Sequence, residues 1–225
     1  MTNMASPKKT EKHVLSEPKQ SRSRASLERI LKATGELLVE RGYSGFTLQD
    51  VSKRGNASIG SIYNRFSGKD DLIRKVQERE FIAMDQETAV LVNDIRRRQL
   101  RLRQLVPTLV KEFAEFLASH RKMLRALMEV AATDIEVAKS GKAFYGRVLK
   151  DFELLLLDRK EEIIQPNPSQ AVDLSFRLVY GAIARHMGLG TVEENLADEA
   201  WEALLNDLSR VMLHYLLSHP DQLVE

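Results

Sequence analysis

Helix-start signals follow one another at short intervals in the first third of the chain, and they constrain the fold more than any other feature of the sequence. Thr47 and Asp50 stand three residues apart, the spacing of a capping box in which each side chain accepts a bond from the other residue's backbone N–H. Ser58 is placed to cap a second helix, and Ser67, with Asp70 three residues on, a third. Only two short helices joined by a tight turn fit between these starts.

Beyond this region, apolar residues recur at helical spacing, and no segment alternates as a strand does. The first long helix is expected to begin with Ser26 as its N-cap and to stop at Gly42. Later helices are expected at about 69–95, 100–119, 121–133, 142–162, 168–187 and 196–218. The sequence therefore predicts an all-α fold. We divide it into a disordered basic tail (1–25), a helix-turn-helix unit (26–72) and a larger helical domain (73–220).

Charge is distributed unevenly, although the net charge is only +2. Residues 1–75 carry 15 Lys and Arg against 8 Asp and Glu, whereas the remaining 150 residues carry 19 against 24. A basic front suggests a polyanionic partner. The start of the chain lacks an apolar signal core, and no run approaches the length of a membrane span, so we expect a cytoplasmic protein that does not engage membranes.

The sequence shows no sign of catalysis. It contains no cysteine, which excludes disulfides and thiolate metal sites, and no histidine follows a glutamate by three residues. The His-Glu-x-x-His, Gly-x-x-x-x-Gly-Lys, Gly-x-Gly-x-x-Gly and Gly-x-Ser-x-Gly motifs are also missing. We therefore expect neither an enzyme nor a metal or cofactor site.

The segment SIGSIYNRF, residues 58–66, has two unlike faces if it is helical. Its apolar face would hold Ile59, Ile62 and Phe66. The opposite face and its flanks would hold Gly60, Ser61, Tyr63, Asn64 and Arg65. Small residues let a helix approach base edges closely, an asparagine can bond a base or a phosphate, and an arginine adds charge. This pattern favours DNA binding. The alternative is a helical hairpin whose tyrosine and arginine lie on the surface without a binding role.

Residues 30–72 resemble the DNA-binding domain of the tetracycline-repressor (TetR) family. The matching features are Gly42-Tyr43, Phe46-Thr47, Ser58-x-Gly60-Ser61-Ile62-Tyr63-x-x-Phe66 and Lys69. Where the family usually reads Ala-Gly-Val-Ser, this chain has Arg54-Gly55-Asn56-Ala57-Ser58. The resemblance implies a dimer that binds a short palindromic operator. It also implies phosphate contacts from Thr47, Tyr63 and Lys69, and base reading by residues 58–65.

The larger domain offers two sets of apolar residues with different expected roles. Aromatic and other large side chains could line a cavity for an apolar effector, or they could simply fill the core. These are Phe113, Phe116, Met123, Leu127, Phe144, Phe152 and Phe176. Stripes on the last two helices could form a four-helix dimer interface, or they could pack only within the chain. These are Val179, Ala182, Ile183, Trp201, Leu204, Leu205, Leu208, Val211, Met212 and Tyr215.

Two hypotheses follow. The first is a dimeric repressor that a small effector releases from its operator. The second is a DNA-binding dimer that is regulated by a protein partner, or that acts without a small effector. A closed apolar cavity in the larger domain would favour the first, and a solid core would favour the second.

Overall fold

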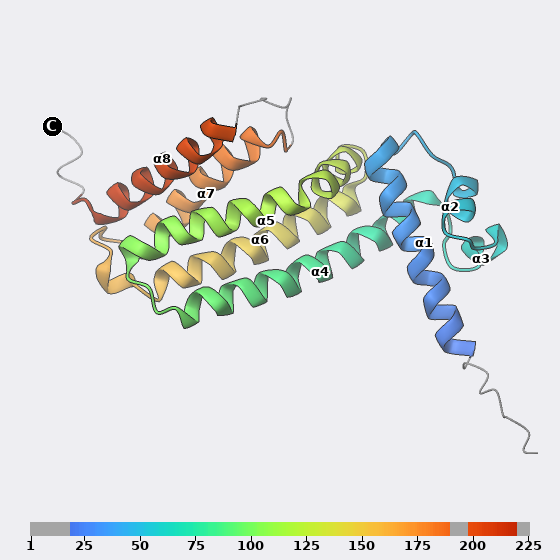
Figure 1. The fold of residues 1–225 in the computed structure, drawn as a ribbon, viewed down its shortest axis with the longest axis horizontal. Helices are drawn as coiled ribbons and strands as arrows, with labels where there is room; N and C mark the ends of the chain where they lie inside the picture. The colour runs from blue at the N-terminus through green and yellow to red at the C-terminus, as the bar shows by residue number, and fades with distance from the viewer. Residues whose placement is uncertain (1–18, 190–197, 220–225) are drawn as a thin grey trace, which may run out of the picture.

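The computed structural model describes residues 19–189 and 198–219. Its helices are α1 (Lys19–Arg41), α2 (Leu48–Arg54), α3 (Ile59–Tyr63), α4 (Lys69–Arg97), α5 (Leu102–Ala131), α6 (Ile135–Leu157), the 3-10 turn η1 (Lys160–Glu162), α7 (Pro168–His186) and α8 (Asp198–Leu217). No strand occurs in these two segments, and the all-α prediction is confirmed. Figure 1 shows an elongated molecule with α1, α2 and α3 at one end and a bundle of longer helices beyond them.

The small unit at this end folds around the apolar faces that the spacing predicted. Ile30, Val51 and Ile62, one from each of its three helices, are fully buried. Gly42 ends α1 as expected: its φ is +67°, and its N–H bonds the carbonyl of Leu38 at 2.9 Å. Glycine adopts this left-handed conformation without the steric cost that a side chain would add.

The turn between α2 and α3 is intact despite its departure from the family pattern. Asn56 has a φ of +45°, a conformation that asparagine tolerates better than most residues. Gly55 has an ordinary φ of −80°, so its small size matters for a different reason. A Cβ atom there would lie 3.0 Å from the carbonyl oxygen of Val51 and 3.2 Å from that of Arg29. A side chain at this position would therefore require the end of α2 to move away from the backbone of α1 at Arg29.

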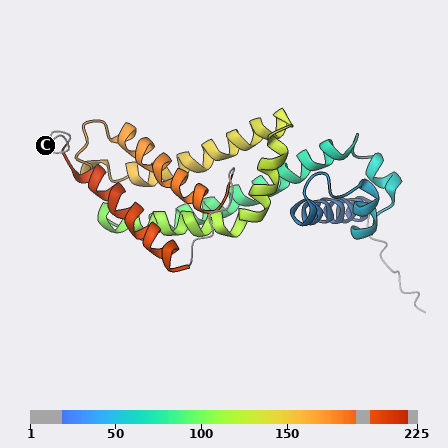
Figure 2. The same ribbon diagram turned by 90° about the horizontal axis from the view of Figure 1, so that it is seen from above.

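The helix α4 joins the two parts of the molecule. Its 29 residues span about 43 Å at 1.5 Å per residue. Leu72 and Ile73 near its start and Ile95 near its end are all buried. Figures 1 and 2 show α4 running from the small unit along the bundle beside α6. Any tilt of α4 against the bundle would therefore move the small unit.

The bundle is held together by an aromatic cluster at its centre. Phe113 of α5 lies 5.0 Å from Phe152 of α6 and 4.9 Å from Phe176 of α7, measured between ring centroids, and all three are buried. The helix α8 packs across α5 and α7. None of the helices in the described segments is long and apolar enough to cross a membrane.

The expected start of the first helix was wrong. α1 begins at Lys19, so residues 19–25 are helical, and Ser26 lies inside the helix instead of capping it. These residues are poor in apolar groups, and that composition suggested disorder. Their stabilising contact comes from elsewhere in the chain, because the guanidinium of Arg65 bonds Ser23. Residues 1–18 of the expected tail lie outside the described segments.

Two other helix boundaries in the bundle were also wrong. The expected helices at 100–119 and 121–133 are one helix, α5, which Figure 2 shows changing direction in its final third. Pro107 lies inside α5 without ending it. The helix expected to start at residue 142 starts at Ile135, because Asp134 caps it by accepting bonds from the N–H groups of Glu136 and Val137. This aspartate is an ordinary N-cap signal in the sequence.

The cap of α4 also differs from the expectation. Gly68 occupies the N-cap position, and no side chain bonds the helix start there. The side chain of Ser67 instead bonds Asp71, and Asp70 accepts a hydrogen bond from the Tyr43 hydroxyl. The loop before α2 is thereby attached to the start of α4.

Candidate nucleic-acid interface and ligand cavity

The N-terminus of α2 is built by the predicted capping box. The backbone N–H of Asp50 bonds the Thr47 hydroxyl oxygen at 3.2 Å, and the backbone N–H of Thr47 bonds the Asp50 carboxylate at 2.8 Å. These hydrogen bonds from Thr47 hold the pKa of the Asp50 carboxyl below its usual range. Thr47 is exposed. It therefore stands at a helix N-terminus where backbone dipoles favour an anion such as a phosphate.

The helix α3 has the two faces that its sequence predicted. Ser58 caps it by accepting a bond from the N–H of Ser61 at 3.1 Å. Ile62 is fully buried, whereas the side chain of Tyr63 is 56% exposed. Ser58, Gly60 and Asn64 are also exposed. No atom lies within 4 Å of where a Cβ on Gly60 would stand, so this face is open to a close approach.

Two of the predicted contact residues on this segment are engaged within the protein. Arg65 donates from Nη1 to the carbonyl and the hydroxyl of Ser61, and from Nη2 to the hydroxyl of Ser23 at 2.9 Å. Both Arg65 and Ser61 are half-buried. The guanidinium thus ties α3 to the first turns of α1, so Arg65 positions the recognition segment as well as adding charge.

Lys69 is also engaged. Its ammonium group donates hydrogen bonds to the carbonyls of Tyr43 and Phe46, and it lies 3.8 Å from the centre of the Phe46 ring. Partial burial among these groups lowers the pKa of Lys69. In this arrangement Lys69 holds the loop between α1 and α2 against α4. A phosphate contact from Lys69 remains a prediction.

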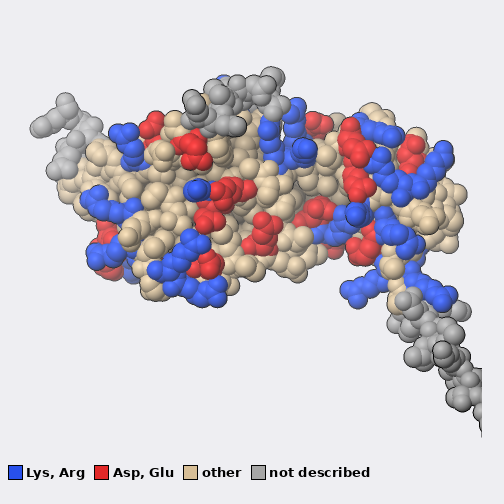
Figure 3. Space-filling model, in the orientation of Figure 1, with Lys and Arg blue, Asp and Glu red and all other residues tan. Residues whose placement is uncertain are grey.

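The structure adds two basic residues that sequence reasoning assigned to the disordered tail. Arg22 and Arg24 lie in the first turns of α1 and are exposed. Figure 3 shows Lys and Arg side chains at this end of α1, whereas basic and acidic side chains are interspersed over the rest of the small unit and the bundle. The hydrogen bonds from Arg65 to Ser23 join these turns to the segment of α3, and no sequence pattern predicts those bonds.

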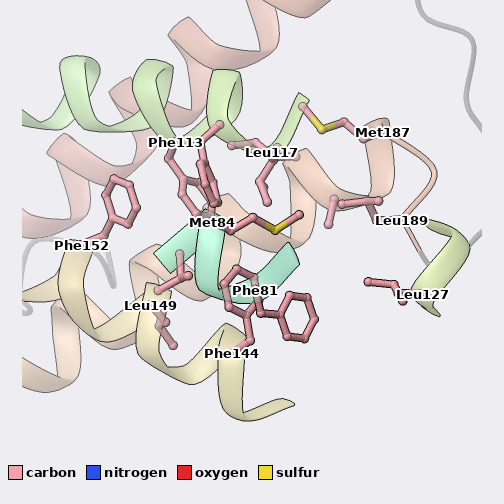
Figure 4. Packing of buried hydrophobic residues seen from close by; sticks show 14 of the residues in the cluster. Phe81, Met84, Phe113, Leu117, Leu127, Phe144, Leu149, Phe152, Met187 and Leu189 are labelled. Atoms are coloured by element: carbon pink, nitrogen blue, oxygen red, sulfur yellow. The ribbon is translucent and has the colours of Figure 1, made fainter. Parts of the chain in front are cut away.

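The bundle contains a cavity of about 330 Å³. Four of the seven predicted effector-binding residues lie in its wall, namely Phe113, Phe116, Leu127 and Phe144. Figure 4 shows the side chains of Leu117 and Leu127 of α5, Phe144 of α6 and Leu189, which follows α7, around this space. The wall also includes residues that were not predicted, among them Gln77, Phe81, Lys142, Tyr145 and Tyr180. Gln77 and Phe81 belong to α4, so the cavity lies directly against the helix that leads to the small unit.

Three predicted effector-binding residues do not line this cavity. Phe152 and Phe176 pack in the aromatic cluster behind Phe113, where they fill the core. Met123 lies between α1 and α5, with its methyl group 3.2 Å from where a Cβ on Gly35 would stand. Spacing along a helix could not distinguish these positions from the cavity wall. In the described residues, no group of three or more His, Asp or Glu side chains could hold a metal ion.

The predicted dimer stripes divide into a buried and an outward-facing set. Val179, Ile183, Leu205 and Met212 are buried within the chain. They cannot meet a partner in this arrangement, and this part of the prediction is corrected. Val211 is exposed, and Ala182, Trp201, Leu204, Leu208 and Tyr215 are half-buried. Leu174 and Leu178 of α7 are also exposed and extend this surface.

Comparisons with known proteins agree with this geometry. Residues 30–76 match the family described as "Bacterial regulatory proteins, tetR family". A putative TetR-family transcriptional regulator from Mesorhizobium loti has a similar structure, with a TM-score of 0.71 at 16% identity over 85% of this chain and 96% of that one. FadR from Bacillus subtilis, solved with stearoyl-CoA, has a TM-score of 0.59 at 16% identity, over 85% of this chain and 99% of the FadR chain. No curated protein sequence matches the chain.

A matched helix-turn-helix domain on a bundle of this fold defines a DNA-binding transcriptional regulator. The likeness at 16% identity establishes the fold over 85% of the chain, and the match at residues 30–76 establishes the DNA-binding domain. The resemblance found in the sequence is thereby confirmed, because residues 30–76 match the DNA-binding domain of the TetR family.

Proposed function

We propose that the protein is a repressor that binds a palindromic operator as a homodimer and leaves it when an apolar small molecule fills the cavity. The observation that carries this proposal is the position of the cavity. Gln77 and Phe81 bring α4 into its wall, and the same helix begins at Lys69 in the DNA-binding unit. A ligand that displaces α4 would therefore change the position of α3.

The contacts of α4 explain how such a displacement would be transmitted. The Gln77 amide donates to the Val137 carbonyl at 2.9 Å, and Arg74 pairs with Asp134 at 2.9 Å, so α4 is bound to the first turn of α6 beside the cavity. An effector must prefer the arrangement that does not bind DNA, because equal affinity for both arrangements shifts neither population. Operator DNA should then weaken effector binding by the same factor.

An apolar effector suits the wall of the cavity. FadR from Bacillus subtilis was solved with stearoyl-CoA, a molecule with a long apolar chain, and this supports an apolar effector for a cavity in a similar fold. The alternative hypothesis is a dimer that is regulated by a protein partner or acts without an effector. It predicts a solid core. A cavity of about 330 Å³ favours the first hypothesis.

The homodimer is proposed from the surface of α7 and α8. Leu174, Leu178 and Gly181 follow one another at helical spacing on α7 and are exposed, as is Val211 on α8. In the described part of the chain, no atom outside the adjoining turns of α7 lies within 4 Å of where a Cβ on Gly181 would stand, so a partner helix can approach it closely. A two-fold axis would pair this surface with itself in a four-helix interface.

The direct test is to select DNA fragments with the purified protein and to sequence them. We expect a palindrome with half-sites about 34 Å apart, or a multiple of it, because each recognition helix covers one half-site. Addition of a compound that stabilises the protein should then release the selected DNA. Stabilising compounds that leave operator affinity unchanged would instead favour the protein-partner alternative.

A further inference from the structure

The wall of the cavity has an unusual charge composition. Among the described residues that line it there is no aspartate or glutamate, and Lys142 is the one charged residue of that set. Its other polar side chains are Gln77, Tyr145 and Tyr180, and the rest are apolar apart from Gly141. A ligand enclosed here loses water, so its charge must find a partner in the wall. The composition therefore discriminates between ligands by the sign of their charge.

The polar groups that can meet a ligand lie together. Lys142 and Tyr145 are three residues apart on α6, which places them on one side of that helix. The Tyr145 ring lies 4.5 Å from the ring of Tyr180 on α7. Burial raises the pKa of both tyrosines, so their hydroxyls stay protonated and can donate. Gln77 differs, because its amide already donates to the Val137 carbonyl.

Lys142 itself is exposed and lies at the solvent side of the cavity, as does Met128. Its ammonium group has no hydrogen bond or ion pair with any residue in the described segments. The neighbouring lysine on α6, Lys139, differs in this respect because it pairs with Glu136 at 2.9 Å. Lys142 thus retains its full capacity to bind an anion at the point where an apolar ligand would end.

We propose that the cavity binds an amphiphile with a single apolar chain and a carboxylate head, and that Lys142 pairs with the carboxylate. The binding of this ligand does not depend on the proposed function. Only its expected effect, release of the protein from the operator, rests on that proposal. The volume of about 330 Å³ holds roughly ten methylene-sized groups at about 30 Å³ each, which suits a chain of medium length. A cationic head would find no carboxylate among the described residues of the wall, and an uncharged head would form no ion pair with Lys142.

Decanoate, decanol and decyltrimethylammonium are matched probes, because they share the chain and differ in the charge of the head. We expect decanoate to bind most tightly in calorimetric titration, decanol more weakly, and the cation not at all. Lys142→Gln should weaken decanoate about tenfold or more, since a charge-assisted hydrogen bond is lost, and leave decanol unchanged. Lys139→Gln is the matched control and should change neither.

A second pair of variants tests whether the ligand occupies this cavity. A Cβ on Gly141 would have only the Gln77 amide within 4 Å, at 3.9 Å, so Gly141→Leu should fill part of the cavity and abolish binding of decanoate and decanol. Gly146 lies on the same helix with open space around it, so Gly146→Leu should bind as the natural protein does. Thermal unfolding of both variants establishes that they are folded.

The outcomes separate this inference from the proposed function. Equal weakening of decanoate and decanol by Lys142→Gln, unchanged decanoate affinity in that variant, or binding of none of the three probes would overturn the inference. If decanol or the cation bound best and released operator DNA, the inference would fail and the proposed function would stand. If decanoate bound through Lys142 without changing operator affinity, the inference would stand and effector-driven release would fail.

Discussion

Single residues in the DNA-binding unit have roles that their types alone do not reveal. Tyr63 and Lys69 were both expected to contact phosphates, but their surroundings in the structure differ. Tyr63 is exposed, and its hydroxyl bonds no other group of the described chain. The ammonium of Lys69 is bound to two carbonyls of the preceding loop. These two residues therefore invite separate tests.

We expect Tyr63→Phe to weaken DNA binding about 10- to 150-fold on all sequences alike, because one hydrogen bond to a charged group such as a phosphate contributes about 1.5–3 kcal/mol. The melting temperature should not change, since the hydroxyl has no partner within the described chain. Binding titrations on the selected operator and on unrelated DNA make the measurement. Loss confined to the operator would mean that Tyr63 reads bases instead.

We expect Lys69→Met to lower the stability of the protein by about 1–3 kcal/mol, because it leaves the carbonyls of Tyr43 and Phe46 without their donor. Thermal unfolding measures this effect. The salt dependence of DNA binding tests the phosphate contact independently, and its slope should fall by about one counterion if Lys69 also reaches the DNA. An unchanged slope would restrict Lys69 to its structural role.

At the scale of elements, α3 depends on α1 for its position. A helix of five residues has too few internal bonds to be stable by itself, and Arg65 supplies a fork of hydrogen bonds to Ser61 and Ser23. The same bonds give the polar first turns of α1 their tertiary contact. The recognition helix and the start of α1 therefore stabilise each other.

Arg65→Lys tests this dependence, because lysine keeps the charge but cannot form the fork. We expect weaker operator binding with an unchanged salt slope, and faster amide exchange over residues 19–26. Ser23→Ala, which removes only the far acceptor, should reproduce the change in exchange. Arg24→Lys is the control, since Arg24 is exposed and bonds no other described residue. A normal exchange rate in Arg65→Lys would count against the tether.

At the scale of the whole molecule, the proposed dimer surface can be tested without disturbing the monomer. Val211 is 63% exposed in the single chain, so Val211→Asp should not affect its folding. In a dimer it would bury a charge, and we expect monomers that bind the operator poorly. Val90 on α4 is 70% exposed, and Val90→Asp is the matched control. Sedimentation would contradict the proposal if Val211→Asp stayed dimeric.

The sequence by itself determined the features that depend on neighbouring residues. Caps, stops and the two faces of α3 are set within a few positions, so the capping box at Thr47, the stop at Gly42 and the burial of Ile62 could all be predicted. The family match rests on the same short-range signals. Phenylalanines of the bundle could be assigned to the interior, because the burial of large apolar surface is the dominant favourable term in folding.

Only the tertiary structure decided which of several similar residues has which neighbour. Phe144 lines a cavity whereas Phe152 fills the core, although both are buried phenylalanines on α6. The bond from Arg65 to Ser23 joins residues that are 42 positions apart in the sequence. The bonds from Lys69 to the loop before α2 span 23 and 26 positions. Side-chain direction and long-range contact depend on how the helices pack against one another, and the spacing of residues within one helix carries no record of that packing.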